Sequence, residues 1–313
     1  MNSPLPIPNC GATGCALLAA ELVMHRGLSY LRCGCGALRL PPSQLRRAAV
    51  EADKAAGGTI MDALFALRLR WLKRSLPQLG VPQTRILDAG CGDGQFLAYL
   101  ARHGHRQLHG VEPEAVRRAN AQARGLSVNA VLAELGAARF DVVFLWHVLE
   151  HVAQPFDLLR QLWARLEPGG ALVVSVPNHD GWQTRWFGRF ASYLDYGRHL
   201  WYWDPSWLEQ VRHELPRARL SVVGGRNLEY EIFGWVDSIV GQLAGERNYV
   251  HSRLKKGTGG TAGHLAATAL AALALPPSAV LALLVSPARA ATFTFALWRD
   301  ASEPGPIEHR EAE

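Results

Sequence analysis

Short apolar runs alternate with amphipathic stretches through the middle of the chain. The runs predict strands over 85–88, 107–112, 127–132, 140–146 and 170–176. The stretches between them predict helices over 96–103, 113–124 and 155–166. Because the runs are apolar on both faces and are separated by helices, the pattern predicts a parallel sheet that helices cover on both sides, an α/β fold.

The regions before and after this alternating part of the chain show a different pattern of apolar and polar positions. Two helices are predicted over 44–56 and 59–79, separated by Gly57-Gly58, and later apolar runs at 219–223 and 291–298 complete a set of seven strands. We therefore expect the following units: a Cys-rich module (1–42), a helical linker or cap (43–80), a sheet domain (81–228 and 290–299), an apolar helical insertion before the last strand (229–289) and a disordered tail (300–313).

Composition narrows the class of protein. Of 313 residues, 49% are hydrophobic and 19% are charged, which excludes a disordered or collagen-like chain. The net charge is +6, and acidic residues are concentrated in the tail, so the rest of the chain is more basic still. That balance suits a nucleotide, a phosphate or a membrane surface without selecting among them.

A Gly-rich turn follows the first strand of the sheet domain. It reads Gly90-Cys91-Gly92-Asp93-Gly94 and leads into a helix, whose free N–H groups and close backbone approach suit a ligand. Asp88 precedes the turn, and Glu112 ends the next strand, where a carboxylate can accept both hydroxyls of a ribose. The third glycine comes one residue too early for a dinucleotide fingerprint, which disfavours a pyrophosphate site.

These residues resemble the class I S-adenosylmethionine-dependent methyltransferases, and more narrowly the small-molecule branch that includes the ubiquinone-biosynthesis O-methyltransferases. The matching segments are 88–94, 110–113, 140–143, 147–152, 166–172, 176–178 and 198–203. The resemblance implies a seven-stranded Rossmann-like sheet. It also implies methyl transfer from S-adenosylmethionine to a small-molecule acceptor, either lipid-like or quinone-like, or a sugar.

The resemblance also implies a set of cofactor-binding residues: Asp88, Gly90, Cys91, Gly92, Gly94, Glu112, Glu134 and Trp146. The glycine turn would pack against the methionine part, Asp88 would orient the turn or meet the amino group, and Glu112 would hold the ribose. Glu134 is the only carboxylate near the expected adenine position, and it could equally be a solvated helix residue.

Three histidines are candidates for catalysis. His147, Glu150 and His151 follow the fourth strand at spacing i, i+3, i+4, so they would share one face of a helical turn. A histidine there could act as a general base; alternatively, the segment could hold a metal, as in some quinol-methylating relatives, or only support the loop. His199 is a second candidate base, or else a packed histidine.

The aromatic segment 182–203 is expected to be a lid over an apolar substrate, or else the underside of an inserted helix. Arg185, Arg189 and Arg198 within it could meet a carboxylate, a phosphate or RNA. No recognised RNA module accompanies them, so we do not expect nucleic-acid binding.

Four cysteines near the N-terminus are candidate metal ligands: Cys10, Cys15, Cys33 and Cys35. They resemble the zinc ribbon that precedes some methyltransferases of this branch, although their spacing is C-x4-C and C-x-C. We expect either a four-thiolate zinc site or a degenerate ribbon that has lost its metal. Cys91 is expected to be a small buried residue.

The segment 265–285 carries no charge and is long enough to span a bilayer. Pro276-Pro277 is predicted to break it into two halves. We expect either a hairpin that enters one leaflet as a peripheral membrane contact, or burial against the domain or a partner chain. The oligomeric state is left open.

Two further functions remain open, an RNA or protein methyltransferase and a non-catalytic S-adenosylmethionine-binding scaffold or membrane adaptor. The chain shows no secretory signal pattern, so we expect a cytoplasmic protein, at the inner face of the membrane if the apolar segment binds there.

Overall fold

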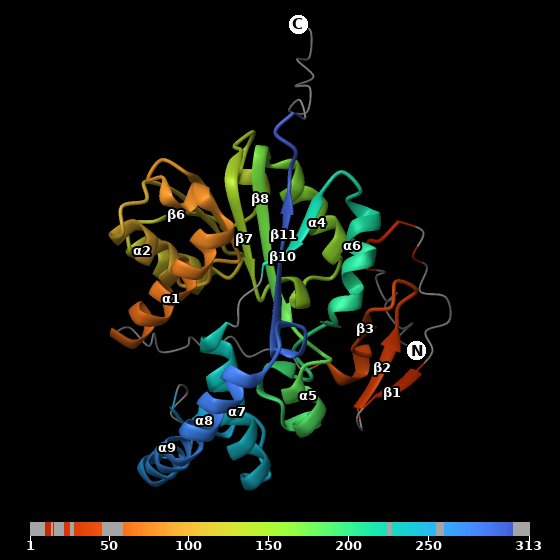
Figure 1. The fold of residues 1–313 in the computed structure, drawn as a ribbon, viewed down its shortest axis with the longest axis vertical. Coiled ribbons are helices and arrows are strands. Elements are labelled where there is room, and N and C mark those ends of the chain that lie inside the picture. Colours follow the sequence, from red (N-terminus) through yellow and green to blue (C-terminus); the bar gives the residue numbers. More distant parts are fainter. Residues whose placement is uncertain are drawn as a thin grey trace, which may run out of the picture.

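The computed structural model describes residues 10–13, 15, 22–25, 28–45, 59–223, 227–254 and 260–302, which form two sheets (Figure 1). The larger sheet has seven strands, in the spatial order β10 (Arg219–Val222), β11 (Thr292–Trp298), β8 (Leu166–Pro177), β7 (Phe140–Trp146), β4 (Arg85–Ala89), β5 (Gln107–Val111) and β6 (Ser127–Asn129). The smaller sheet has the order β1 (Leu22–His25), β2 (Leu28–Arg32), β3 (Leu38–Arg39) and β9 (Trp201–Tyr202).

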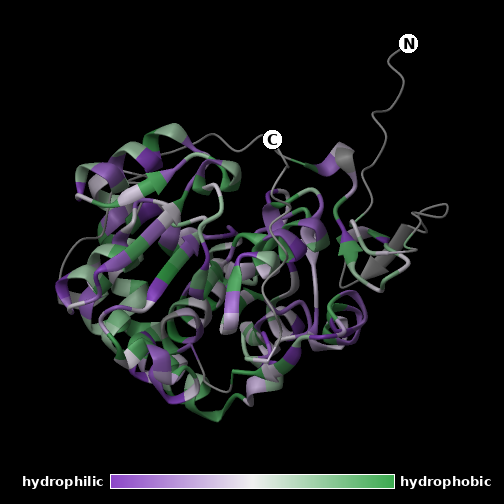
Figure 2. Cartoon of the chain, turned by 90° about the horizontal axis from the view of Figure 1, so that it is seen from above, coloured by the Kyte–Doolittle hydropathy of each residue, from purple (hydrophilic) through white to green (hydrophobic). Residues whose placement is uncertain are grey.

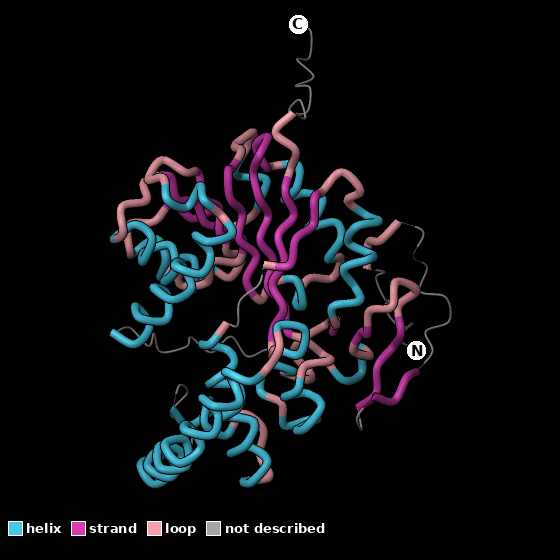
Figure 3. The backbone as a smooth tube through the Cα atoms, in the orientation of Figure 1, coloured by secondary structure: helices cyan, strands magenta, loops and turns pink. Residues whose placement is uncertain are grey.

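The five strands from β8 to β6 are parallel. β11 runs antiparallel to β8, and β10 runs antiparallel to β11, so β11 is the one reversed strand of this seven-stranded sheet (Figure 3). Asp88 of β4 is in register with Gly110 of β5 and with Phe144 of β7. The carboxyl ends of these three strands therefore meet at one edge of the sheet, where ligands bind in open α/β folds.

Successive strand residues point to opposite faces, and each face has its own helices. Ile86, Val142 and Phe144 pack against α1 (Thr59–Ser75) and α2 (Gln95–Arg102). Leu87 and Val143 pack against α4 (Pro155–Ala164) and α6 (Leu208–Glu214) on the other face. α3 (Ala115–Ala123) connects β5 to β6. In Figure 2, apolar residues recur along the central strands and on the helices beside them.

The predicted α/β fold is confirmed, with differences at some boundaries. β8 starts earlier than expected because 166–169 continue the strand, and β6 ends earlier because a 3-10 turn follows it at Leu132–Leu135. Most of the helix predicted over 44–56, and the tail from 303 onward, lie outside the described residues.

β9 belongs to the N-terminal sheet. Leu38 and Arg39 of β3 pair with Tyr202 and Trp201, and the N–H of Leu40 donates to the carbonyl of Leu200 at 2.9 Å. The cysteine-containing module is thus joined through a shared sheet to the segment that carries His199.

The insertion lies beyond the carboxyl edge of the sheet, at the lower left of Figure 1. It consists of α7 (Leu228–Ala244), α8 (Tyr249–Leu254) and α9 (Gly260–Leu284), and α7 also contacts α5 (Trp182–Phe187). α9 is long and apolar enough to cross a membrane by length and composition, and 22% of its most apolar window is buried.

The predicted break at Pro276-Pro277 is wrong, because α9 continues through both prolines. They remove the N–H donors for the carbonyls of Ala272 and Leu273, but residues on both sides of the pair, including Ala267 and Ser278, are buried along α9. That packing holds the two halves in line at the cost of two backbone hydrogen bonds.

Candidate functional site

The glycine turn and Glu112 form one hydrogen-bonded unit. The carboxylate of Glu112 accepts from the N–H of Gly92 and from the N–H of Glu114, each at 2.9 Å. The N–H groups of Gly90 and Cys91 both donate to the carbonyl of Val111, at 2.7 and 3.1 Å. The turn after β4 is therefore fixed to the end of β5, and the predicted ribose carboxylate lies beside it.

Two of the glycines are required for different reasons. Gly90 has φ +82°, and a Cβ there would lie 2.2 Å from Val148. Gly92 has φ +56°, and a Cβ there would meet nothing within 4 Å. Gly90 thus allows close packing inside the domain, whereas Gly92 borders open space on the ligand side of the turn.

Asp88 is buried at the end of β4, directly below this turn. Burial raises its pKa to about 7; the positive charge of Arg68 opposes that rise, and the negative charge of Glu112 adds to it. Among the described residues, Oδ1 of Asp88 has no hydrogen-bond partner. A buried carboxylate that lacks a donor is suited to receive one from a cationic ligand.

Arg68 is a site residue that the sequence analysis missed. Its guanidinium, on α1, lies 5.0 Å from the ring centroid of Trp146 and 5.3 Å from that of Phe96. Both distances are within cation–π range. A signal was present in the sequence, because Arg68 lies four residues from Leu72 on the buried stripe of its helix, where an arginine needs a specific reason.

His147 has a strained backbone and a carboxylate partner. Its φ is +51°, in the left-handed region that non-glycine residues rarely occupy. Its Nδ1 lies 3.2 Å from Oε1 of Glu150, which is fully buried. Burial alone raises the pKa of Glu150, but the hydrogen bond to His147 and the neighbouring histidines together lower it below its usual value. Glu150 can therefore orient the His147 ring as an ionised acceptor.

His151 and His199 meet on the other side of Glu150. Their rings are 4.7 Å apart in an edge contact, and the N–H of Leu200 donates to the carbonyl of Glu150 at 2.8 Å. Burial lowers the pKa of His199 to about 4, so its imidazole is neutral near pH 7. Glu150, His151 and His199 each place one ligand atom within 4.8 Å of the others, a set that could share a proton or a divalent ion.

The structure thus brings the three predicted catalytic histidines together around one carboxylate. Two tyrosines lie beside this cluster. The ring of Tyr230, on α7, lies 4.4 Å from that of His147, and Tyr193, from the predicted aromatic segment, lies 6.2 Å from it. Tyr230 was not predicted, because a long-range contact of this kind leaves no local pattern in a sequence.

The aromatic side chains of segment 182–203 do not lie together on one surface. Trp201 and Trp203 are buried in the core, where Trp203 stacks on Trp207 at 4.6 Å. Trp182 and Trp186 stack on each other, with Trp186 exposed. Only part of the segment, including Tyr193 and His199, faces the histidine cluster.

The remaining predicted cofactor residues have distinct positions. Glu134 is exposed after β6, and its carboxylate accepts from the N–H of Ala130 at 2.8 Å. The thiol of Cys91 lies where a Cβ on Gly110 would be only 2.7 Å away, so it fills the space that the glycine leaves. Burial also raises the pKa of Cys91, which favours a packing role over a nucleophilic one.

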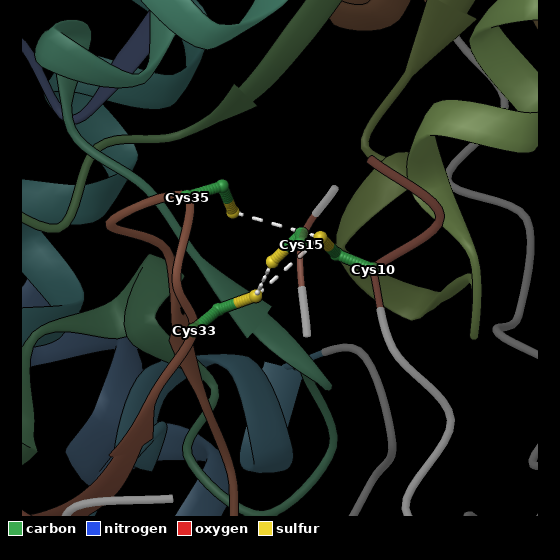
Figure 4. A group of neighbouring side chains, drawn as sticks. All are labelled: Cys10, Cys15, Cys33 and Cys35. Atoms are coloured by element: carbon green, nitrogen blue, oxygen red, sulfur yellow. Dashed lines mark hydrogen bonds between the residues drawn. The ribbon is translucent and has the colours of Figure 1, made fainter. Parts of the chain in front are cut away.

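The four N-terminal cysteines form one cluster, with all four sulfurs within 4.8 Å of one another (Figure 4). The sulfur of Cys33 lies 3.1 Å from that of Cys15 and 3.4 Å from that of Cys10, and Cys10 lies 3.6 Å from Cys35. Four thiolates bound to one zinc at about 2.3 Å would lie roughly 3.8 Å apart, so the arrangement fits a tetrahedral ion. Hydrogen bonds from Cys10 and Cys35 lower the pKa of Cys33.

Two of the three candidate anion-binding arginines are engaged within the chain. Arg185 pairs with Asp180 at 2.5 Å, and Arg198 pairs with Asp195 at 3.2 Å. The guanidinium of Arg189 lies over the ring of Phe190 at 4.9 Å. These contacts reduce the positive charge that the aromatic segment offers to a phosphate.

Comparison with known proteins gives several relatives that are named as methyltransferases. The tRNA 5-carboxymethoxyuridine methyltransferase of Escherichia coli K12 is 34% identical over 121 residues, which are 35% of this chain and 46% of that protein. The ubiquinone biosynthesis O-methyltransferase of Cereibacter sphaeroides is 37% identical over 120 residues, 36% of this chain and 47% of that protein. The chain thus spans about half the length of the curated relatives it matches.

A solved structure of the plantazolicin methyltransferase BpumL has a TM-score of 0.48 and 14% identity, with 76% of this chain and 85% of that one covered. The sequence model of the methyltransferase domain matches residues 58–215 of this chain. That range contains the glycine turn, Glu112 and the histidine cluster, and it is just over half of the 313 residues. The chain therefore belongs to the methyltransferase-domain family.

Proposed function

We propose that this chain transfers the methyl group of S-adenosylmethionine to a hydroxyl group of a small organic acceptor. The observation that carries the proposal is the position of two units at the same sheet edge: the Glu112-fixed glycine turn after β4 and the His147–Glu150 pair after β7. The first suits a ribose-bearing ligand, and the second suits removal of a proton.

When bound, S-adenosylmethionine supplies a methyl group that its sulfonium already activates. The residues of this chain then have three tasks: Glu112 accepts from the ribose hydroxyls, Asp88 accepts from the amino group, and Arg68 balances the charge of Asp88. Trp146 and the glycine turn enclose the methionine part. We thus add Arg68 to the cofactor-binding residues that the family resemblance implied.

We assign the proton acceptor to His147. If Nδ1–H of His147 donates to Glu150, its Nε2 is an acceptor, and no described residue is hydrogen-bonded to that atom. The acceptor oxygen forms its bond to the methyl carbon as the carbon–sulfur bond breaks, with that electron pair going to sulfur. The hydroxyl proton goes to Nε2 of His147, and Glu150 stabilises the charged ring.

A second candidate is methylation of RNA. It is favoured by the 34% identity to a protein named as a tRNA methyltransferase. The pairing of Arg185 and Arg198 with aspartates weighs against it. We place the small-molecule acceptor first and leave its chemical class, lipid, quinone or sugar, to experiment.

We also propose that the cysteine cluster binds one zinc ion. Such an ion would cross-link two short segments of the N-terminal module, 10–15 and 33–35. Through β3 and β9, this module would help to hold the chain that carries His199.

The test is transfer of radiolabelled methyl from S-adenosylmethionine into an extract of the source cells, followed by organic and aqueous separation. Label in the organic phase supports a lipid-like or quinone-like acceptor, and acid-soluble aqueous label supports a sugar. Label that is precipitated by acid and released by ribonuclease supports the RNA alternative. The Glu112→Ala variant is the control, and transfer that survives in it contradicts the assigned site.

A further inference from the structure

The outward surface of α9 is apolar around about half of its circumference. Its large exposed side chains are Leu265, Leu273, Leu275, Val280, Leu283 and Leu284. At 3.6 residues per turn, these positions spread over an arc of about 180°. No Asp, Glu, Lys or Arg occurs between Gly260 and Leu284.

The inward face of α9 carries small residues instead. Its buried members are Ala267, Ala274, Ser278 and Ala282, and the helix contacts α7 along this side. A helix at the surface of a water-soluble domain places its large apolar residues inward and polar residues outward. α9 has the reverse order, which is common in helices that pack through small residues and present large ones to lipid.

The breadth of the exposed arc identifies what could cover it. A single helix of a second protein chain covers a stripe of roughly 100°. An arc of about 180° exceeds one such stripe, whereas acyl chains are fluid and fill an arc of any width. Lipid therefore covers this surface more completely than one helix of a second copy of the chain would.

The charge around α9 suits anionic lipid. From Arg247 to Arg299 the chain contains four arginines and two lysines, and it contains no aspartate or glutamate. Arg253 precedes α9 and Arg289 follows it, but Arg253 pairs with Glu246 at 2.8 Å and Arg289 pairs with Asp180. The net positive charge of this part of the sequence therefore rests on Lys255 and Lys256, which come shortly before α9. Basic residues beside an apolar helix face are the pattern by which interfacial helices bind anionic bilayers.

The attachment of α9 decides how it sits in the bilayer. α7, which packs along it, carries the buried carboxylates of Glu231 and Asp237, and these would be costly to carry across a membrane. α7 follows β10 and α9 leads into β11, so both helices are anchored to the sheet. We propose that α9 docks the protein on an anionic bilayer, in the plane of the interface, with its outward leucines among the acyl chains.

The test is flotation of the full chain with vesicles of phosphatidylcholine alone, or with about one-third phosphatidylglycerol. We expect at least tenfold more protein to float with the anionic vesicles, and less as salt is raised. The variant carrying both Leu273→Asp and Leu283→Asp, at side chains that are 76% and 58% exposed, should lose at least tenfold of this binding. Val116→Asp, at a side chain on α3 that is 52% exposed, should bind like the wild type.

Melting temperature and S-adenosylhomocysteine affinity, measured on each variant, separate a lost surface from a lost fold. If the aspartate pair unfolds the chain, the pair of Leu273→Ser and Leu283→Ser replaces it. The proposal is overturned if the wild type fails to float with anionic vesicles, or if the folded double variant floats as well as the wild type. It is also overturned if the wild type forms a dimer that the double variant disrupts while neither floats.

Discussion

The guanidinium of Arg68 lies over the indole ring of Trp146, 5.0 Å from its centroid, which places α1 beside the end of β7. The same guanidinium opposes the burial-induced rise in the pKa of Asp88. One arginine thus links the helix before the sheet to both strand ends that form the predicted cofactor site.

Replacing Arg68 with alanine should weaken S-adenosylhomocysteine binding by about tenfold or more, because the charge that balances Asp88 and the stacking on Trp146 are both lost. Arg68→Lys keeps the charge and should lose less of this affinity. Isothermal titration calorimetry of the wild type and the two variants measures the three affinities. Equal affinities in all three would show that Arg68 only packs.

Binding should depend on pH through Asp88. Its pKa of about 7 means that the carboxylate is half protonated there, and only the ionised form accepts from the ligand's ammonium. Affinity should therefore rise by about tenfold from pH 6 to pH 8 and then level off. Asp88→Asn should bind weakly with little pH dependence, whereas Arg68→Ala should move the transition to higher pH.

The ionisation of Asp88 should also make the free energy of unfolding depend on pH, in a direction that the sign of its pKa shift determines. The pKa of Asp88 is higher in the folded state than its ordinary value, so the folded chain holds this proton more tightly. The free energy of unfolding should fall as pH rises from about 4 to about 7. The melting temperature of Asp88→Asn, relative to wild type, should therefore be higher at pH 8 than at pH 5. The reverse order would contradict the burial argument.

Removing the proton acceptor should affect turnover and leave cofactor binding intact. We expect His147→Asn to lower kcat by about 100-fold or more, with S-adenosylhomocysteine affinity close to wild type. His213→Asn, at an exposed histidine on α6, is the matched control and should keep full activity. If His147→Asn turns over normally while His199→Asn does not, the base is His199.

The cysteine cluster should hold one metal ion for each chain. Elemental analysis should find about one zinc in the wild type and in Cys91→Ser, and well below one in Cys33→Ser. A chelator should lower the melting temperature of the wild type but not that of Cys33→Ser. One zinc ion for each chain in Cys33→Ser, or no zinc in the wild type, would contradict a four-thiolate site.

The sheet could be predicted from the sequence because each central strand is a continuous apolar run, and its helices have a clear period. The glycine turn, Glu112 and the histidine segment could be placed at one edge for the same reason, since each follows a parallel strand. Other features arise from tertiary contacts. β9 is two residues long and pairs with a distant strand, and α9 passes through Pro276-Pro277 because its packing along α7 overrides the local preference.

The site residues divide in the same way. Those in local motifs, such as Asp88 and His147, could be named in advance. Tyr230 could not, because it reaches the site from α7, whose sequence carries no motif, and Arg68 was missed although its position offered a signal. An arginine on a buried helical stripe is the one local sign that would have identified Arg68.

The cofactor site is best tested by equilibrium binding of S-adenosylhomocysteine to the wild type and to Glu112→Ala. Glu112 both fixes the Gly92 turn and faces the predicted ribose, so its loss should cost about tenfold to 100-fold in affinity. We expect micromolar binding to the wild type and a large loss of affinity in the variant. Absent binding to the wild type, or equal binding to both proteins, would contradict the assignment of this sheet edge as the cofactor site.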